Sequence, residues 1–242
     1  GGLLLMGGGD RNTQAMKWFL AKAGAGHIVI LRASYAGEIG EEFYRDIGGI
    51  RSAETFVFSS RKGASDPQVL NAIRHADGIF IAGGDQSNYV RFWKGTEVAK
   101  LLDAHVAAGK PLAGTSAGLA MLGERLYGAM DGGSLTSVEG LADPFGPAVT
   151  IERDFLHLAL LHRVVTDTHF KERDRLGRLF AFLAKAQAGE PADQPAMYGV
   201  GVDEAAALAV DADGTARIYS THPEGIAWLV DGSALRDVAT AG

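Results

Sequence analysis

The chain has 242 residues, a length that allows one large domain without requiring a second. Its charged fraction of 21% and hydrophobic fraction of 47% are those of a packed globular protein and exclude a disordered chain. The formal net charge of -6 argues against a nucleic acid or an anionic membrane as the main partner. The absence of cysteine excludes disulfides, thiolate metal sites and a cysteine nucleophile.

The beginning of the chain leaves the compartment open. The first residue is Gly1 rather than a methionine, and an apolar run follows almost at once, so we expect further residues upstream. No apolar run approaches the roughly 18 residues that suggest a membrane span. The protein is therefore expected in the cytoplasm or, if a signal peptide precedes Gly1, in the periplasm or outside the cell.

The first half of the chain alternates short apolar runs with segments of helical spacing. The apolar runs are bounded by glycine or polar residues, as buried strands are, and lie at 3–6, 27–31, 55–58, 78–82 and 111–113. In the segments at 12–22, 66–75 and 98–108, apolar residues return every three or four positions. This alternation predicts an α/β fold, a three-layer sandwich with a mostly parallel central sheet between helices.

The second half continues this pattern and then changes. A strand is predicted at 162–165, a helix at 172–186 and a loop at 187–196. Four short apolar runs separated by turns follow at 198–202, 206–210, 216–219 and 226–230. We expect them to add antiparallel strands at one edge of the sheet near the C-terminus, within a single domain that spans residues 1–242.

A candidate nucleophile lies in the sequence Gly114-Thr115-Ser116-Ala117-Gly118, which fits the pattern G-x-S-x-G. The motif follows a predicted strand and precedes the helix-prone segment 119–126, the strand, turn and helix context that a nucleophilic serine requires. The glycines allow a turn too tight for side chains, and the helix start supplies amide groups for an oxyanion. From sequence alone, a purely structural tight turn explains the pattern equally well.

Two further predicted strands end in glycine-rich loops, at 6–10 and 82–86. The carboxyl ends of parallel strands share one sheet edge, where open α/β sheets bind their ligands. The first loop lacks the spacing of a nucleotide-binding loop. In the second, a glycine amide could complete an oxyanion hole, and Gln86 could contact a polar substrate, while Asp85 is explained as a turn residue.

The candidate base is His169, because it alone of the seven histidines follows a predicted strand end at this edge. An imidazole base needs a carboxylate to fix its tautomer. Spacing leaves five candidates open: Asp167, Glu172, Asp174, Asp203 and Glu204. Three arginines follow His169, namely Arg173, Arg175 and Arg178. They form either a solvated surface or a recognition site for carboxylates.

Five blocks of the sequence together resemble the cyanophycinases, the polymer-degrading branch of the peptidase E superfamily. The blocks are 7–10, 83–86, 114–118, 167–179 and 199–204. The resemblance implies a fold like that of class I glutamine amidotransferases, with serine in place of the nucleophilic cysteine. It implies a triad of Ser116, His169 and Glu204, and an oxyanion hole formed by the amides of Gly84 and Ala117. The implied substrate-binding residues are Gln86, Asp167, Thr168, Arg173, Arg175 and Arg178.

The resemblance further implies hydrolysis of aspartyl backbone bonds in cyanophycin, with release of β-Asp-Arg dipeptides through an acyl-enzyme. It implies a homodimer and requires neither a metal nor another cofactor. One departure is Thr168, because the cyanophycinases have glutamine at this position. The alternative is a peptidase E-like enzyme that cuts aspartyl or isoaspartyl dipeptides or other short peptides. More distant alternatives are an amidotransferase-like enzyme, which the missing cysteine disfavours, and a catalytically silent binding module.

Overall fold

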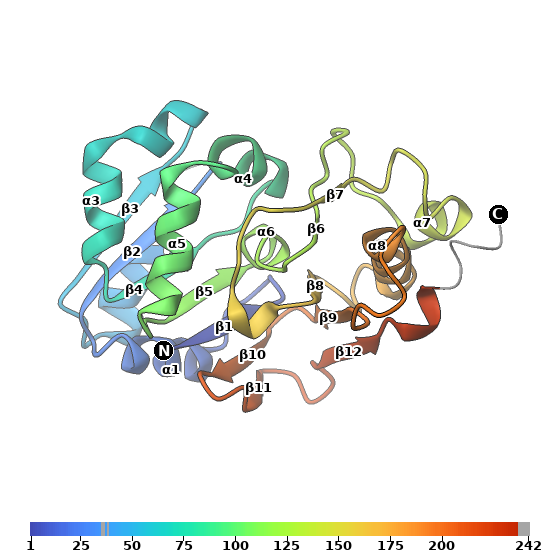
Figure 1. The fold of residues 1–242 in the computed structure, drawn as a ribbon. Helices are drawn as coiled ribbons and strands as arrows, with labels where there is room; N and C mark the ends of the chain where they lie inside the picture. The colour runs from blue at the N-terminus through green and yellow to red at the C-terminus, as the bar shows by residue number, and fades with distance from the viewer. Residues whose placement is uncertain (35–36, 38, 237–242) are drawn as a thin grey trace.

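The computed structural model describes residues 1–34, 37 and 39–236. The predicted domain limit at residue 242 therefore falls outside the described residues. Among the described residues, no helix combines the length and the apolar character that crossing a bilayer demands. Figure 1 shows an elongated molecule in which the large sheet and its helices lie at one end and α7 (Ser137–Ala142) and α8 (Leu176–Gln187) at the other.

The central sheet has seven strands in the described part of the chain, in the order β11-β10-β1-β5-β4-β2-β3. The neighbours from β1 to β3 in this order pair in parallel, whereas β10 and β11 are antiparallel additions at one edge. The strands are β1 (Gly2–Met6), β2 (His27–Arg32), β3 (Ser52–Val57), β4 (Gly78–Ile81), β5 (Leu112–Thr115), β10 (Ala206–Asp211) and β11 (Ala216–Ser220). The predicted mostly parallel sheet with antiparallel strands near the C-terminus is confirmed.

Helices cover both faces of this sheet, as expected for a three-layer sandwich (Figure 1). Alternate residues of β1 show why: Leu3 and Leu5 pack with α3, α4 and α5, whereas Leu4 and Met6 pack with α1 on the opposite face. A strand buried on both faces has to be apolar throughout, which explains its continuous run. The helices are α1 (Thr13–Lys22), α3 (Pro67–His75), α4 (Gln86–Trp93) and α5 (Glu97–Ala107), with short segments α2 (Ile39–Glu42), η1 (Phe43–Ile47) and η2 (Arg61–Ser65).

A second sheet holds part of the chain that we expected at the edge of the first. In the described residues it has three strands, β8 (Val164–Asp167), β9 (Tyr198–Val202) and β12 (Ala227–Asp231), and β9 pairs in parallel with β8. The expectation that 198–202 and 226–230 extend the central sheet is wrong. The glycines of β9 explain the difference, because a Cβ at Gly199 would lie 2.8 Å from Leu179 and one at Gly201 2.5 Å from the Phe170 ring. The glycine face of β9 thus lies against Phe170 and Leu179 of a separate hydrophobic cluster, whereas Val200 and Val202 on its other face belong to the cluster beside the central sheet.

The remaining elements complete this second unit of the fold. They are α6 (Ala117–Ala120), β6 (Leu126–Tyr127), α7 (Ser137–Ala142), β7 (Ile151–Glu152), η3 (Ala159–Leu161), α8 (Leu176–Gln187) and η4 (Ser233–Leu235). The helix expected over 119–126 is wrong, since α6 ends at Ala120. Residues 121–125 instead form a turn and a bend that pass close to β8, since a Cβ at Gly123 would lie 2.7 Å from the carbonyl oxygen of Val164. The helix expected from residue 172 begins only at Leu176, after a turn.

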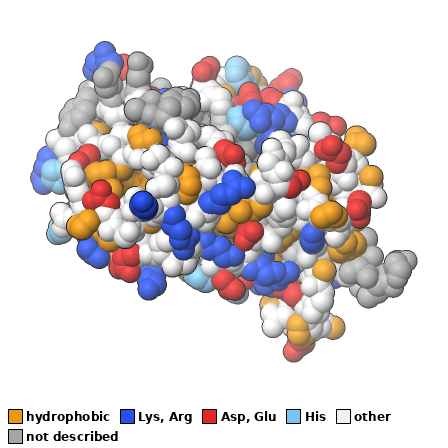
Figure 2. Space-filling model, turned by 90° about the horizontal axis from the view of Figure 1, so that it is seen from above, with side chains coloured by type: hydrophobic (Ala, Val, Ile, Leu, Met, Phe, Trp, Pro, Cys, Tyr) orange, Lys and Arg blue, Asp and Glu red, His pale blue; other side chains and the backbone are white. Residues whose placement is uncertain are grey.

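The face seen from above in Figure 2 carries Lys and Arg side chains across its middle, interspersed with acidic ones. The net charge of -6 is therefore not spread evenly over the surface. Local positive potential of this kind allows anionic groups to bind to a chain whose total charge is negative.

Replacement of Phe80 by alanine tests the packing beneath the sheet. This ring is fully buried and meets Phe19 and Phe43 edge to face, at centroid distances of 6.3 and 5.7 Å. We expect Phe80→Ala to lower the free energy of unfolding, measured by urea denaturation, by about 3–5 kcal/mol. The control Leu229→Ala removes a side chain that is 73% exposed and is expected to change it by about 0.5 kcal/mol or less. Equal losses in the two variants would contradict this description of the core.

Candidate active site

Ser116 occupies a sharp turn between β5 and α6. Its backbone has φ 52° and ψ -122°, an unusual conformation for a residue with a side chain. Its flanking glycines are required by close approaches: a Cβ at Gly114 would lie 2.4 Å from the carbonyl oxygen of Gly118, and one at Gly118 2.2 Å from that of Ile81. The turn therefore depends on both glycines, and it places Ser116 at the start of α6.

His169 meets this serine from the second sheet. It follows the end of β8, and its Nε2 lies 2.7 Å from the Ser116 Oγ. Its backbone has φ 45°, and its N–H donates to the carbonyl oxygen of Gly7 at 2.8 Å. The base predicted from sequence therefore lies within hydrogen-bonding distance of the predicted nucleophile.

Glu204 supplies the carboxylate that faces His169. It follows β9, and its Oε1 lies 2.6 Å from the His169 Nδ1. Its own N–H donates to the Glu172 Oε2 at 3.0 Å, and the next N–H, that of Ala205, donates to the carbonyl oxygen of Gly8 at 2.9 Å. Of the five carboxylates that spacing left open, the structure brings Glu204 to the imidazole.

Asp203 has a different place, which sequence reasoning missed by treating it only as a possible partner of the histidine. Its side chain is fully buried and accepts hydrogen bonds from the Lys171 N–H at 3.0 Å, the Trp228 indole N–H at 3.1 Å and the Ile226 N–H at 3.1 Å. These bonds fix the loop after His169 and the start of β12. The signal for this role was Asp203 itself, a carboxylate directly after an apolar strand.

The first glycine-rich loop lies directly under the imidazole. A Cβ at Gly8 would lie 2.3 Å from the His169 Cε1, and one at Gly9 would lie 3.2 Å from the Glu204 Cβ. The carbonyl groups of Gly7 and Gly8 also accept the two hydrogen bonds described above. From the sequence, this loop was expected at the ligand-binding edge of the sheet and not as a nucleotide-binding loop, and the structure places it against His169 and Glu204.

A pocket of about 290 Å³ opens beside Ser116. Four of the six residues predicted to bind substrate line it, and they are Gln86, Thr168, Arg173 and Arg175. The loop of residues 129–134 contributes Ala129, Gly132, Gly133 and Ser134 to the wall, and sequence analysis did not identify this loop. Gly84 and Ala117 also border the pocket, so the two amides predicted for an oxyanion hole lie at this site.

The other two predicted contacts, Asp167 and Arg178, lie behind the pocket rather than in it. Both side chains are 1% exposed and form two hydrogen bonds with each other, Nε to Oδ2 at 2.7 Å and Nη2 to Oδ1 at 2.5 Å. The Asp167 Oδ1 also accepts the Thr168 N–H at 2.8 Å. The pair therefore fixes the position of Thr168 in the pocket wall. Both oxygens of Asp167 already accept hydrogen bonds, so this carboxylate has little hydrogen-bonding capacity left for a ligand.

Arg175 provides a cation at the pocket wall. Its Nη1 donates to the Thr168 carbonyl oxygen at 2.9 Å and to the Thr168 Oγ1 at 3.2 Å. Burial, followed by the neighbouring charge of Arg178, lowers the pKa of Arg175 to about 10. Arg175 is therefore still positively charged at neutral pH, and with the exposed Arg173 it makes the pocket suited to an anionic group.

The environment of His169 favours its neutral form. Burial lowers its pKa, the hydrogen bond to Glu204 acts in the opposite direction, and the positive charges of Arg173 and Arg175 lower it further. A neutral imidazole can accept the proton of a serine hydroxyl, which the imidazolium cannot.

The family follows from comparison with known proteins. The model of "Peptidase family S51" matches residues 3–218. The chain belongs to peptidase family S51. It is 29% identical over 227 residues to "Cyanophycinase" of Synechococcus elongatus, covering 89% of this chain and 64% of that relative. It is 26% identical over 243 residues to "Cyanophycinase" of Trichormus variabilis, covering 96% and 74%. The S51 chain thus spans 64% of the length of the first of these relatives.

Solved structures share the fold of this S51 chain. A "peptidase from an acI-B1 Actinobacterium" has a TM-score of 0.63 at 17% identity, with 96% of each chain covered. A "Putative Peptidase E Protein" from Listeria monocytogenes EGD-e has a TM-score of 0.56 at 13% identity, covering 91% of this chain and 98% of that one. At such low identity, the likeness concerns the fold alone.

The contact between Gly8 and the imidazole generates a first prediction for the site. We expect Gly8→Ala to push the His169 ring away from Ser116 and to slow the labelling of Ser116 by a fluorophosphonate probe by about 100-fold, because reactivity depends on this geometry. The matched control is Gly214→Ala. Gly214 also has a positive φ, but its Cβ would meet nothing within 4 Å, so labelling should stay near the wild-type rate. Equal rates in the two variants would contradict the role of Gly8.

The pKa of His169 generates a second prediction. Labelling of Ser116 requires neutral imidazole, so its rate should rise with pH through the pKa of His169, at a midpoint below the ordinary value of about 6.5. Arg173→Gln removes a positive charge that lowers this pKa, so the midpoint should move to higher pH. The control Lys62→Gln removes an exposed charge of η2 and should leave it in place. A midpoint that stays or falls in Arg173→Gln would refute the assignment.

Proposed function

We propose that this chain is a serine peptidase in which Ser116, His169 and Glu204 form the catalytic triad. The observation that carries the proposal is the continuous chain of two hydrogen-bonding contacts, at 2.7 Å from Ser116 to His169 and 2.6 Å from His169 to Glu204. A serine hydroxyl gains nucleophilicity from such a base, and the base gains orientation and charge stabilisation from the carboxylate. Membership of peptidase family S51 supports the same activity.

In the proposed mechanism, the Ser116 Oγ attacks the carbonyl carbon of an aspartyl bond while the His169 Nε2 takes its proton. The amides of Gly84 and Ala117 stabilise the negative oxygen that forms. The carbon–nitrogen bond then breaks, and His169 returns the proton to the departing amine. Water then attacks the resulting ester while His169 takes a proton from it. The bond to the Ser116 Oγ breaks, His169 returns the proton to this oxygen, and the new carboxylate is released.

For the substrate we propose cyanophycin, with release of β-Asp-Arg dipeptides. The cations of Arg173 and Arg175 at the pocket suit the α-carboxylate that the arginine of each β-Asp-Arg unit carries, and Gln86 offers an amide donor and acceptor beside them. Asp167 and Arg178 would act indirectly, by holding Thr168 in the wall. The relatives named "Cyanophycinase" support this choice of substrate.

A second candidate substrate class is short aspartyl peptides. One observation favours it: the Thr168 Oγ1 accepts a hydrogen bond from the Arg175 Nη1, so the side chain that replaces the expected glutamine is directed at the protein and offers no amide to a ligand. The pocket volume of about 290 Å³ is also small for several linked units of a branched polymer.

The two substrate classes are separated by one experiment. The purified protein is incubated with insoluble cyanophycin and, separately, with short β-aspartyl and α-aspartyl peptides, while turbidity is followed and products are identified by mass spectrometry. We expect the polymer suspension to clear and β-Asp-Arg to accumulate. If only short peptides are cut, the triad stands but the polymer assignment fails. Thr168→Gln, which restores the amide, should then gain activity on the polymer.

The triad is tested in the same assay with Ser116→Ala. Loss of the nucleophile is expected to lower turnover at least about 1,000-fold while the urea unfolding midpoint stays within the error of the measurement. The matched control is Ser65→Ala, which removes a hydroxyl remote from the pocket in the short helix η2 and should keep the wild-type rate. Substantial turnover by Ser116→Ala would remove the serine mechanism. The homodimer stays a prediction, which light scattering of the purified chain would test.

A further inference from the structure

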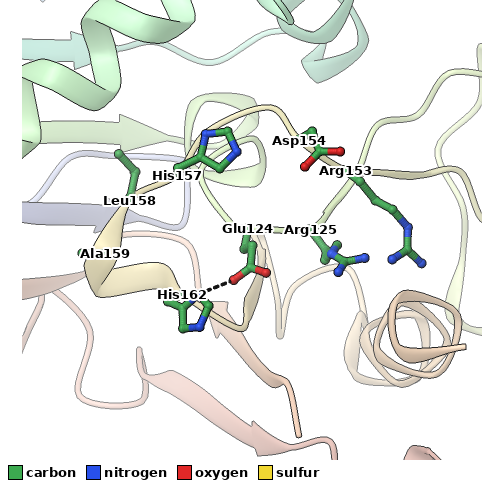
Figure 3. A pocket seen from close by; sticks show the side chains of 8 residues that line it. All are labelled: Glu124, Arg125, Arg153, Asp154, His157, Leu158, Ala159 and His162. Atoms are coloured by element: carbon green, nitrogen blue, oxygen red, sulfur yellow. Dashed lines mark ion pairs between the residues drawn. The ribbon is translucent and has the colours of Figure 1, made fainter. Parts of the chain in front are cut away.

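A second cavity, of about 580 Å³, lies outside the active site. Its walls come from the segment between α6 and β6, from the segment after β7 and from η3, as Figure 3 shows. The charged and titratable residues at its wall are Glu124, Arg125, Arg153, Asp154, His157 and His162. None of the residues that line the active-site pocket is among them. The cavity adjoins the beginning of β8, whereas His169 follows the end of that strand, so the two pockets lie at opposite ends of β8.

Guanidinium groups gather at and behind one part of this cavity, where Arg125 and Arg153 line it and Arg163 lies behind them. Glu190 accepts hydrogen bonds from the Arg125 Nη2 at 3.0 Å and from the Arg163 Nη1 and Nη2 at 2.8 and 2.7 Å, so one carboxylate serves two guanidinium groups. The hydrogen bond from Arg163 is the main cause that lowers the pKa of Glu190, and the charges of Arg163, Arg125 and Arg236 add to it. Arg153 brings a further guanidinium, which donates only to the Ala186 carbonyl oxygen, at 3.2 Å, among the bonds of the described residues.

Hydrogen-bonding capacity is also left over in this cluster. Two buried side-chain nitrogens here have no hydrogen-bond partner among the described residues, and they are the Arg125 Nη1 at the cavity and the Arg163 Nε behind it. Buried polar groups without partners are costly, and such groups often indicate a ligand or an ion that would satisfy them. The guanidinium groups therefore have both the charge and the donors to accept a carboxylate.

Negative charge also lies at the wall of the same cavity, next to the arginines in the chain (Figure 3). Asp154 has an exposed carboxylate with no ion pair among the described residues, and its backbone is left-handed, with φ 53°. Glu124 lies nearby and faces the His162 Nδ1 at 2.8 Å (Figure 3). A ligand that brings only negative charge would be repelled by these two carboxylates, whereas a ligand with both a carboxylate and a cationic group would match both kinds of charge at the wall.

We propose that this cavity is a second binding site for a zwitterionic aspartyl-arginine unit, with a ligand carboxylate at Arg125 and Arg153 and a ligand cation at Asp154. The choice of this ligand rests on the proposed function, which supplies a substrate and product of that chemistry. A volume of about 580 Å³ is sufficient for a dipeptide. Because the cavity lies apart from Ser116, the site would hold one unit of a chain while another occupies the active-site pocket.

Isothermal titration of the whole protein with β-Asp-Arg tests the proposal. We expect one binding component whose dissociation constant rises at least about tenfold in the double variant Arg153→Gln/Asp154→Asn, since this variant lacks one charged partner for each end of the ligand. Both changes should be tolerated, because Arg153 donates only one hydrogen bond in the described structure and asparagine adopts the left-handed conformation readily. The control Arg217→Gln/Asp213→Asn removes one exposed charge of each sign next to β11 and should bind as the wild type does.

Two related probes define the ligand. L-aspartate lacks the guanidinium and argininamide lacks the carboxylate, so both should bind this site at least about tenfold more weakly than β-Asp-Arg. Equal binding of L-aspartate and β-Asp-Arg would overturn the role of Asp154, and equal binding of argininamide would overturn that of the arginines. Unchanged titration of the Arg153→Gln/Asp154→Asn variant would overturn the site itself.

Hydrolysis assays separate this proposal from the proposed function. Cleavage of short aspartyl peptides by the Arg153→Gln/Asp154→Asn variant should equal that of the wild type, since no residue of the active-site pocket is changed. If the wild-type protein cleaves none of the substrates, but the binding component seen with the wild type is lost in this variant, the second site stands and the peptidase assignment fails. If cleavage is intact and the binding component does not depend on these residues, the reverse holds.

Discussion

The arrangement of the site depends on close backbone contact between the end of β1 and two loops of the second sheet. The carbonyl groups of Gly7 and Gly8 accept the N–H groups of His169 and Ala205, and a side chain at either glycine would displace one of those loops. Ser116 follows β5 of the central sheet, whereas His169 and Glu204 follow strands of the smaller one. Two glycine carbonyls thus set the distance between the candidate nucleophile and the candidate base.

Buried charges reinforce this contact from the side of the second sheet. The carboxylate of Asp203 binds three hydrogen donors from the loop after His169 and from the start of β12, and the paired Asp167 and Arg178 lie beneath Thr168. Such groups contribute little net stability when compared with apolar packing, but a substitution that removes one partner leaves the other charge buried and unpaired, which is costly. Their arrangement instead specifies a single position for the two loops.

Much of this could be predicted from the sequence where the signal is local. The apolar runs predicted the parallel strands, and the glycines around Ser116 and the strand before His169 singled out the two residues that the structure brings together. The expectation that both follow strands of one sheet is wrong, because β8 belongs to the second sheet. Spacing could not choose Glu204, because the pairing of β8 with β9 brings together segments separated by α8 and a loop. For the same reason the second sheet, the buried place of Asp203 and the arginine cluster around Glu190 were not foreseen: each depends on contacts between segments far apart in the chain.

The division of the site between two sheets also bears on how activity is lost on heating. The large hydrophobic cluster on one face of the central sheet receives Val200 and Val202 from β9 but is built mostly from residues of the central sheet and its helices. The strands that precede His169 and Glu204 belong to a three-stranded sheet among the described residues. Parts of a protein open separately when they have few stabilising contacts of their own. Opening of the smaller sheet alone would separate His169 from Ser116 and inactivate the protein while most of its secondary structure persists. Thermal inactivation should therefore precede the cooperative loss of the circular dichroism signal.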